Sequence, residues 1–363
     1  MNIRNYEELI EKKLNEIKGK CIFLYGAKNM GDIAYKLLRH YHVEVAGYIV
    51  SGDAPNSACM NNVPIYGLNE FCLNCKDNVV VILTLNKMYH GQVISALRDK
   101  GIVHIDDTFF EYQHYFFADL FERLFRQNNI DLSKGTMEIG DYRQLNPYIH
   151  PNMASFFLEA GDLILPALLN NYDFIIEGPY ENENVALTEG DVVLDCGANI
   201  GLFSCYAASR KCTTYAFEPI GGNLAETLAY HIRLHSPLMR LVPYALADGV
   251  GQMEMNVASF ADCGASLVSN KYTDSSITVE TTTIDHFVKE ARLDRVDFIK
   301  ADIEGAERLM LAGAKETLRK FTPKLAICTY HLPDDPQVLE AIIKEANPSY
   351  HVAHRWKKLF AWT

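Results

Sequence analysis

Three side chains late in the chain could together take a proton from a substrate hydroxyl. Asp302 and Glu304 follow the apolar run VDFIK, and His331 follows the run KLAICTY. Because a neutral imidazole titrates near physiological pH, we expect His331 to be the general base. Glu304 would orient it or hold a substrate hydroxyl, and Asp302 is a second candidate. Carboxylate and imidazole groups could also hold a divalent cation. That alternative stays open, but the base is favoured, and no metal ligand is assigned.

The segment VVLDCGANIGLFS has the composition of a turn that passes close to a bound ligand. Asp195 ends its apolar part, and Gly197, Asn199 and Gly201 follow. The two glycines permit a tight turn and a close approach of the backbone to a cofactor. The next strand-like run ends in Glu218, where a carboxylate can accept both hydroxyl hydrogens of a ribose. Together these residues predict a site for a nucleoside-bearing cofactor.

Asp195 bears on which cofactor this is. A dinucleotide needs backbone amides that face its diphosphate at a helix N-terminus. A carboxylate just before the turn would repel that diphosphate, whereas it would suit the ammonium group of a methionine moiety. The residues therefore favour S-adenosylmethionine over a dinucleotide. A sulfonium is already an activated donor, so the protein mainly has to hold the acceptor in line with it.

These residues require a sheet that brings the ends of its strands together. The second half of the chain alternates strand-like runs (DVVLDCG, CTTYAFEP, RLVPYALAD, VDFIKADIEG, KLAICTYH) with helical segments. Nearly continuous apolar runs are typical of parallel strands covered on both faces. Ligands bind such doubly wound α/β sheets beyond the carboxyl ends of the strands. Each candidate residue follows or ends one of these runs.

Three further patterns occur in the same half. GQMEMNVASF and ITVETTTI alternate like an antiparallel hairpin, and YHVAHRWKKLFAWT is typical of two short strands that turn at Lys357–Lys358. His231 and His235 have the i, i+4 spacing of a helix. Because their segment otherwise resembles an ordinary amphipathic helix, we interpret both as solvated.

The first half predicts a smaller Rossmann-like α/β domain. Apolar runs alternate with helical ones up to residue 107. YGAKNMG at Tyr25–Gly31 is similar to a dinucleotide loop, but Lys28 replaces the central glycine, and Asp53 lies in a loop near the place of a ribose-binding acid. This domain could bind a nucleotide or nucleotide sugar, or serve as a scaffold.

Between the two halves we expect a connector. FFEYQHYFFADLFERLF has a helical period, and its aromatic stripe suggests packing between domains or protomers, which would allow a homodimer through this helix or the N-terminal domain. The polar stretch QNNIDLSKGTMEIGDYRQLNP is interpreted as a linker. The predicted division is residues 1–107, a connector at 108–150, and a second domain at 151–363.

Composition limits the partners. The 363 residues have a formal net charge of −12, which gives no general attraction to nucleic acid. No run approaches the length of a membrane span. The nine cysteines are scattered, and the CxxC pair Cys72 and Cys75 lacks the second ligand pair that zinc would need. We therefore expect a cytoplasmic protein with reduced thiols and a small-molecule or carbohydrate substrate.

Several motifs together resemble the FkbM family of class I methyltransferases. VVLDCGANIGLFS, AFEP, ALAD and DFIKADIEGAE follow one another in the order and spacing of that family, and the resemblance covers roughly Asp173–Thr363. It implies a class I methyltransferase sheet with S-adenosylmethionine as cofactor. By this resemblance, the residues that line the cofactor are Asp195, Gly197, Asn199, Gly201 and Glu218, with Asp248 near the adenine.

The resemblance implies a reaction class. The family methylates mostly hydroxyl oxygens of sugars and of polyketide-type natural products. We therefore expect an O-methyltransferase that acts on a sugar or a sugar-containing intermediate, for example in surface polysaccharide synthesis. Two alternatives stay open: an NAD-dependent or nucleotide-sugar-modifying enzyme that uses the N-terminal domain, and a scaffold protein without activity.

Overall fold

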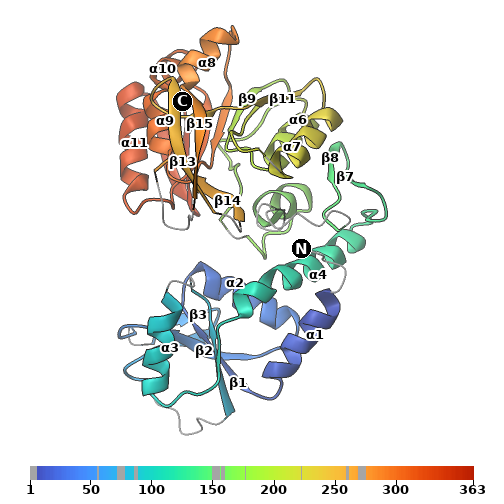
Figure 1. Ribbon diagram of the computed structural model, residues 1–363, viewed down its shortest axis with the longest axis vertical. Coiled ribbons are helices and arrows are strands. Elements are labelled where there is room, and N and C mark those ends of the chain that lie inside the picture. The colour runs from blue at the N-terminus through green and yellow to red at the C-terminus, as the bar shows by residue number, and fades with distance from the viewer. Residues whose placement is uncertain are drawn as a thin grey trace. The chain divides into compact units, whose positions relative to one another are not determined.

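The chain forms two compact units, Met1–Asn129 and Ile130–Thr363 (Figure 1). The computed structural model describes residues 6–54, 57–71, 78–85, 89–148, 156, 160–175, 177–221, 223–258, 261–268 and 275–363. Cys72 and Cys75 lie outside the described residues. None of the helices in the described ranges is long and apolar enough to cross a membrane.

The first unit is built on a mostly parallel sheet. Its strands run in the order β3 (Cys59–Met60), β4 (Val63–Gly67), β2 (Val45–Val50), β1 (Cys21–Tyr25), β5 (Val79–Leu83) and β6 (Ile105–Asp106). Its helices are α1 (Tyr6–Ile17), α2 (Asn29–His40), α3 (His90–Asp99) and α4 (Phe109–Gln127). Only β3 pairs antiparallel among these strands. The apolar runs in the sequence correspond to β1, β2 and β5, whereas β3 and β4 were not predicted.

The aromatic helix α4 belongs to the core of this unit. Phe116, Phe121 and Phe125 have no exposed surface, and α4 packs against α1. The buried ammonium of Lys13 on α1 lies 2.7 Å from an Asp106 carboxylate oxygen, which ties α1 to the end of β6. The stripe is therefore explained by packing inside the first unit. Whether this unit also forms a dimer contact stays a prediction.

The second unit contains the doubly wound sheet predicted from the sequence. Its strands run in the order β11 (Met239–Val242), β10 (Thr213–Phe217), β9 (Val192–Cys196), β16 (Phe298–Ala301), β17 (Lys324–Cys328), β19 (Lys358–Trp362) and β18 (His351–Arg355). All neighbours are parallel except the pairs made by β19. β9 lies between β10, the next strand in the chain, and β16, which is made later. The carboxyl end of β9 is therefore the switch point at which ligands bind.

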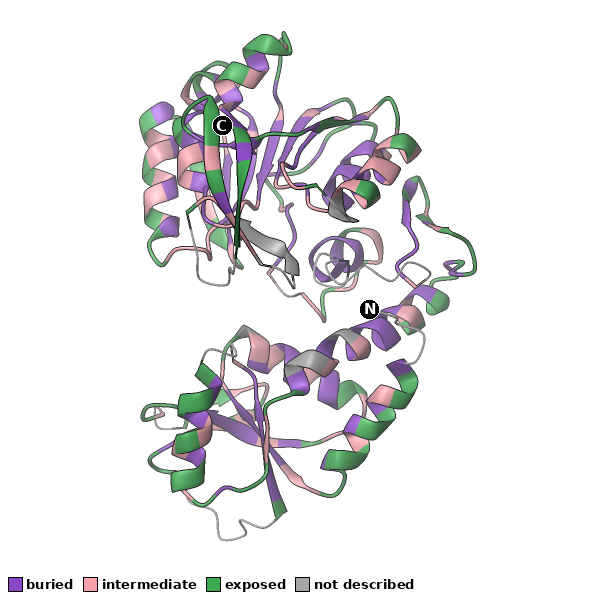
Figure 2. Ribbon diagram, in the orientation of Figure 1, coloured by how far each residue is buried: buried purple, intermediate pink, exposed green. Residues whose placement is uncertain are grey.

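Helices cover this sheet, and the same unit contains a second, four-stranded sheet. The helices are η4 (Ile164–Leu168), α6 (Leu202–Ser209), α7 (Asn223–Leu234), α8 (Ile284–Glu290), α9 (Glu307–Ala312), α10 (Lys315–Phe321) and α11 (Asp335–Ala346). The second sheet has the order β12 (Ala245–Leu246), β15 (Ser275–Thr282), β13 (Gly251–Ala258) and β14 (Ala261–Ser266). The predicted antiparallel hairpin is confirmed as β13 and β15, which expose much of their length (Figure 2). The predicted C-terminal strand pair is also confirmed.

The segment interpreted as a linker contains an ordered hairpin instead, β7 (Thr136–Ile139) paired with β8 (Tyr142–Leu145). Gln144 and Asn146 are fully buried despite their polarity. The Asn146 amide donates to the carbonyl groups of Leu132 and Lys134, so this buried polar group has hydrogen-bond partners. Polar composition suggested a linker because the sequence does not show that these side chains have internal partners.

The interpretation of His231 as solvated is wrong. Its side chain is fully buried, and its Nδ1–H donates to the carbonyl of Ile200 at 2.6 Å. Its Nε2 accepts the amide N–H of Leu145 in β8 at 2.8 Å. His235, only partly buried, donates from Nε2 to the Arg143 carbonyl at 2.7 Å. His231 on α7 and His235 just after it therefore hold the hairpin, and His231 also holds the turn after β9.

Stability should depend on the charge of His231. Burial lowers the pKa of its imidazole from 6.5 to about 4, because the charged form cannot be hydrated. The unfolded chain therefore binds more protons than the folded chain between these values. We expect full stability above pH 6.5 and a loss of about 3 kcal/mol as the pH falls to 4. Urea unfolding at pH 5 and pH 7 measures this. His231→Gln, which cannot titrate, should show a smaller loss, and an equal loss would contradict the assignment.

Candidate active site

The turn after β9 lies directly against the end of β16. Gly197 has φ +78°, and a Cβ placed on it would lie 2.0 Å from the backbone oxygen of Asp302. Gly201 has φ +87°, and its Cβ would meet Leu228 and Met239 at 2.7 and 2.9 Å. Both positions favour a left-handed backbone. The Gly197 position also excludes a larger side chain, whereas a side chain at Gly201 would require Leu228 and Met239 to move. The glycines therefore bring the predicted cofactor turn and the predicted acid cluster to one edge of the sheet.

Asp195 has a different environment from the one expected. Its side chain is fully buried, and one carboxylate oxygen lies 3.1 Å from the ammonium of Lys300, its neighbour across β16. The other oxygen accepts the Ser204 hydroxyl at 2.6 Å. Lys300 also donates to the carbonyl of Gly197 at 2.6 Å. Because its charge is matched inside the protein, Asp195 fixes the turn and is not available to a ligand ammonium in this arrangement.

Glu218 lies at the end of β10 and links two parts of the site. One carboxylate oxygen accepts the N–H of Asn199 at 2.9 Å, and the other accepts the N–H of Ile220 at 3.0 Å. Asn199 itself has φ +50° in the left-handed region. Burial raises the pKa of Glu218 to about 7, although both N–H groups act in the opposite direction. A carboxylate oxygen has a further lone pair, so Glu218 can still accept ribose hydroxyls.

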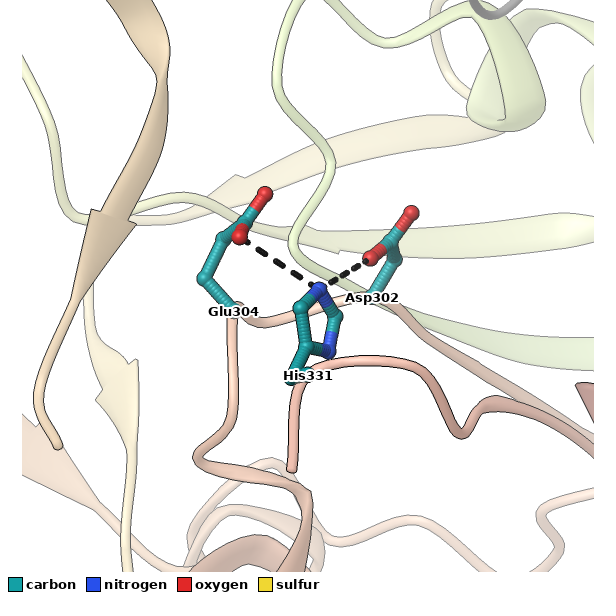
Figure 3. Close-up of side chains that lie close together, drawn as sticks. All are labelled: Asp302, Glu304 and His331. Atoms are coloured by element: carbon teal, nitrogen blue, oxygen red, sulfur yellow. Dashed lines mark ion pairs between the residues drawn. The ribbon is translucent and has the colours of Figure 1, made fainter. Parts of the chain in front are cut away.

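Asp302, Glu304 and His331 gather beyond the ends of β16 and β17. Figure 3 shows the imidazole between the two carboxylates. His331 Nε2 lies 3.5 Å from an oxygen of Asp302 and 3.3 Å from an oxygen of Glu304. Glu304 has φ +54°, an uncommon conformation for a residue with a side chain and one that recurs at functional sites. The sequence predicted the three residues as one group, and the structure places them together.

The imidazole of His331 differs from the neutral base that the sequence predicts. Burial alone would lower its pKa, but the carboxylates of Glu304, Glu307 and Asp302 raise it to about 11. The ring then holds a proton near neutral pH, so in this state it cannot take another from a substrate. The carboxylates beside it keep that capacity.

Four residues that the sequence reasoning missed support this cluster. Glu307 is fully buried, and its Oε1 lies 3.1 Å from His331 Nδ1. Tyr180 and Tyr330 donate to the two oxygens of Asp302 at 2.9 and 3.1 Å. The fourth is Lys300, whose position within an apolar strand-like run was a usable signal, because a buried charge requires a partner.

Other residues that the sequence singled out lie elsewhere in the chain. Asp248, which the resemblance places near the adenine, is exposed in the turn between β12 and β13, and its role at the cofactor stays a prediction. In the first unit, Lys28 is exposed just before α2, and Asp53 is exposed in the loop after β2. A Cβ on Gly31 would lie 2.0 Å from the Gly26 carbonyl, so this loop is tight. A ligand for the first unit stays a prediction.

Comparison with known proteins decides the family. Residues 195–350, which include the turn after β9 and the whole acid cluster, match the family model described as the methyltransferase FkbM domain. This part of the second unit is therefore an FkbM methyltransferase domain. The FkbM match and the doubly wound sheet support S-adenosylmethionine as the cofactor.

Individual relatives of the FkbM domain were also found. The hexuronic acid methyltransferase AglP of Haloferax volcanii is 27% identical over 164 residues, which are 45% of this chain and 66% of AglP. The 2-O-methyltransferase NoeI of Sinorhizobium fredii is 47% identical over 47 residues, 13% of this chain and 19% of NoeI. A solved FkbM methyltransferase from Methylobacillus flagellatus aligns at 17% identity and a TM-score of 0.43, over 100% of this chain and 94% of its own. This chain thus matches less than two thirds of either curated relative.

Proposed function

We propose that this protein transfers the methyl group of S-adenosylmethionine to a hydroxyl oxygen of a sugar or a sugar-containing intermediate. The observation that supports it most is the contact between Gly197 and Asp302, which brings a nucleoside-type turn against a cluster able to hold a hydroxyl. Two relatives bear names that fit this substrate class, one for a hexuronic acid and one for a 2-O position.

The proposed roles follow from where the side chains lie. Gly197, Asn199, Gly201 and Glu218 would hold the cofactor, with Asp195 fixing the turn from inside. The acceptor hydroxyl would lie at the cluster of Asp302, Glu304 and His331. Its oxygen forms a bond to the methyl carbon as the carbon–sulfur bond breaks, and S-adenosylhomocysteine leaves as a neutral thioether. The hydroxyl proton passes to Glu304, the more exposed of the two carboxylates. A positioned base of this kind contributes ~10²–10⁴-fold to the rate.

Two measurements test the proposal. S-adenosylhomocysteine should raise the melting temperature of the full chain, because a ligand that binds only the folded state stabilises it. Labelled S-adenosylmethionine should then transfer its methyl group to oligosaccharides that contain hexuronic acid or other pyranose units. Absence of a thermal shift at millimolar S-adenosylhomocysteine would contradict the proposal.

Cofactor affinity should depend on the ionisation of Glu218. Ribose hydroxyls donate hydrogen bonds, so they bind the carboxylate better than the carboxylic acid. With a pKa of about 7 in the free protein, affinity for S-adenosylhomocysteine should be highest above pH 7. It should fall by up to tenfold per pH unit below that value. Calorimetric titration from pH 5.5 to pH 8.5 measures this. Glu218→Gln should bind more weakly with a flatter pH profile, and an unchanged profile would remove Glu218 from the site.

A further inference from the structure

The geometry around His331 fits an ion better than it fits hydrogen bonds. Its ring nitrogens lie 3.1 to 3.5 Å from carboxylate oxygens, yet neither makes a hydrogen bond of acceptable geometry with the residues that the structure describes. The side chain is only 7% exposed, so a lost hydrogen bond there is costly. Nε2 is buried at ion-pair distance from two carboxylates but has no hydrogen bond to either, which indicates room for a partner that all three groups share.

The distances agree with a shared cation. One ligand atom from each of Asp302, Glu304 and His331 can be chosen so that all three lie within 4.8 Å of one another. Ligand atoms about 2.1 Å from one ion lie about 3.0 Å apart at right angles and about 3.4 Å apart in a tetrahedral arrangement. Nε2 lies 3.3 Å from the Glu304 oxygen and 3.5 Å from the Asp302 oxygen. Small side-chain movements would complete the site.

Residues behind the cluster are arranged as they are around metal ligands. A histidine that binds a metal through one ring nitrogen usually gives the other N–H to a carboxylate. Glu307 holds that position at Nδ1 and is itself fixed, because its Oε1 accepts the Ile303 N–H at 2.9 Å. Asp302 is held by Tyr180 and Tyr330. Asp302 is therefore oriented before any ligand arrives, and Glu307 is placed to orient His331.

The charge of the cluster also suits a cation. Asp302, Glu304 and Glu307 bring three carboxylates to one imidazole. Lys300 and Lys358 help to lower the pKa of Asp302, but their ammonium groups are bonded elsewhere: Lys300 pairs with Asp195, and Lys358 donates to the carbonyl of Gly178 at 2.6 Å. A divalent ion would balance the carboxylates more completely than a proton on His331 can.

We propose that Asp302, Glu304 and His331 bind one divalent cation, which displaces the Nε2 proton of His331 to solvent and holds the acceptor by two neighbouring oxygens. This inference rests on the proposed function. An ion with six positions keeps about three for other ligands, so a vicinal diol or a hydroxy acid can bind through two oxygens. A bound ion would make the acceptor hydroxyl more acidic, and the Glu304 oxygen that does not bind the ion would take its proton as the methyl group is transferred. Acceptors without a second neighbouring oxygen should be poor substrates.

Binding of Mn²⁺ to the full chain, stripped with a chelator, tests the site without any assay of activity. Mn²⁺ accepts carboxylate ligands and is detected by its paramagnetic resonance signal. We expect one ion per chain, competition by Mg²⁺ or Zn²⁺, and weaker binding in Glu304→Gln and Asp302→Asn. Glu307→Gln, which keeps the oxygen for Ile303, should weaken binding by roughly 10–100-fold through the orientation of His331.

A matched control separates this site from ordinary surface carboxylates. Glu340 lies 2.9 Å from Nε2 of His354 on the surface, so Glu340→Gln removes a similar pair and should leave Mn²⁺ binding unchanged. S-adenosylhomocysteine binding is measured on the same samples. If the cofactor binds but Mn²⁺ does not at millimolar concentration, the cation site is wrong and the proposed function stands. Mn²⁺ binding that Glu304→Gln and Asp302→Asn leave unchanged would also overturn the site.

Discussion

Replacing Gly197 by alanine is expected to abolish S-adenosylhomocysteine binding and to destabilise the second unit by about 3–5 kcal/mol. The new Cβ would lie 2.0 Å from the backbone oxygen of Asp302, so neither side can yield by rotating a side chain. The turn after β9 or the end of β16 has to move instead. Thermal unfolding and calorimetric titration with S-adenosylhomocysteine measure both effects.

Gly190→Ala is the control for this substitution. Gly190 has φ +87°, similar to Gly197, but a Cβ there would meet nothing within 4 Å. It should therefore show only the conformational cost of about 1–2 kcal/mol and should bind the cofactor normally. Equal effects of the two substitutions would mean that backbone conformation, and not the contact with β16, explains the glycine.

The second large effect is expected from Asp195→Asn. It leaves the ammonium of Lys300, whose side chain is 6% exposed, without its charged partner inside the protein. Removal of one partner of a buried pair typically costs about 3–5 kcal/mol, because the remaining charge is uncompensated. Urea unfolding at neutral pH measures this. Cofactor affinity should also fall, since Lys300 holds the carbonyl of Gly197.

Two further variants make the test specific. Glu345→Gln breaks the exposed pair with Lys315 and should change stability little, because solvent screens such pairs. Combining Asp195→Asn with Lys300→Met removes the unpaired charge and should recover part of the lost stability. If the double variant is no more stable than Asp195→Asn, the charge of Lys300 is not the cause.

Much of the fold could be predicted because burial leaves a direct pattern in the sequence. The apolar runs VVLD and FIKA became β9 and β16, and the alternation in GQMEMNVA became β13. The grouping of Asp302, Glu304 and His331 also followed from the pattern, since parallel strands end at one edge of a sheet. These predictions needed only local periodicity and the topology rule.

The remaining features depend on contacts between distant segments. The partner of Asp195 lies on a strand made about a hundred residues later, and the register between β9 and β16 decides that they meet. His231 has the spacing of a surface residue, yet its partners are Ile200 and Leu145. The hairpin of β7 and β8 was missed for the same reason: its buried polar groups are satisfied by residues that the local pattern does not indicate.

The position of β19 bears on the order in which the second unit can assemble during synthesis. β18 is made first, but its neighbour in the sheet is β19, which lies between it and β17. β18 therefore has no partner in this sheet until the residues of β19 have been made. β19 also supplies Lys358, whose ammonium binds the carbonyl of Gly178. The last described strand of the first unit ends at residue 106. The sheet of the first unit can therefore form while β18 is still being synthesised.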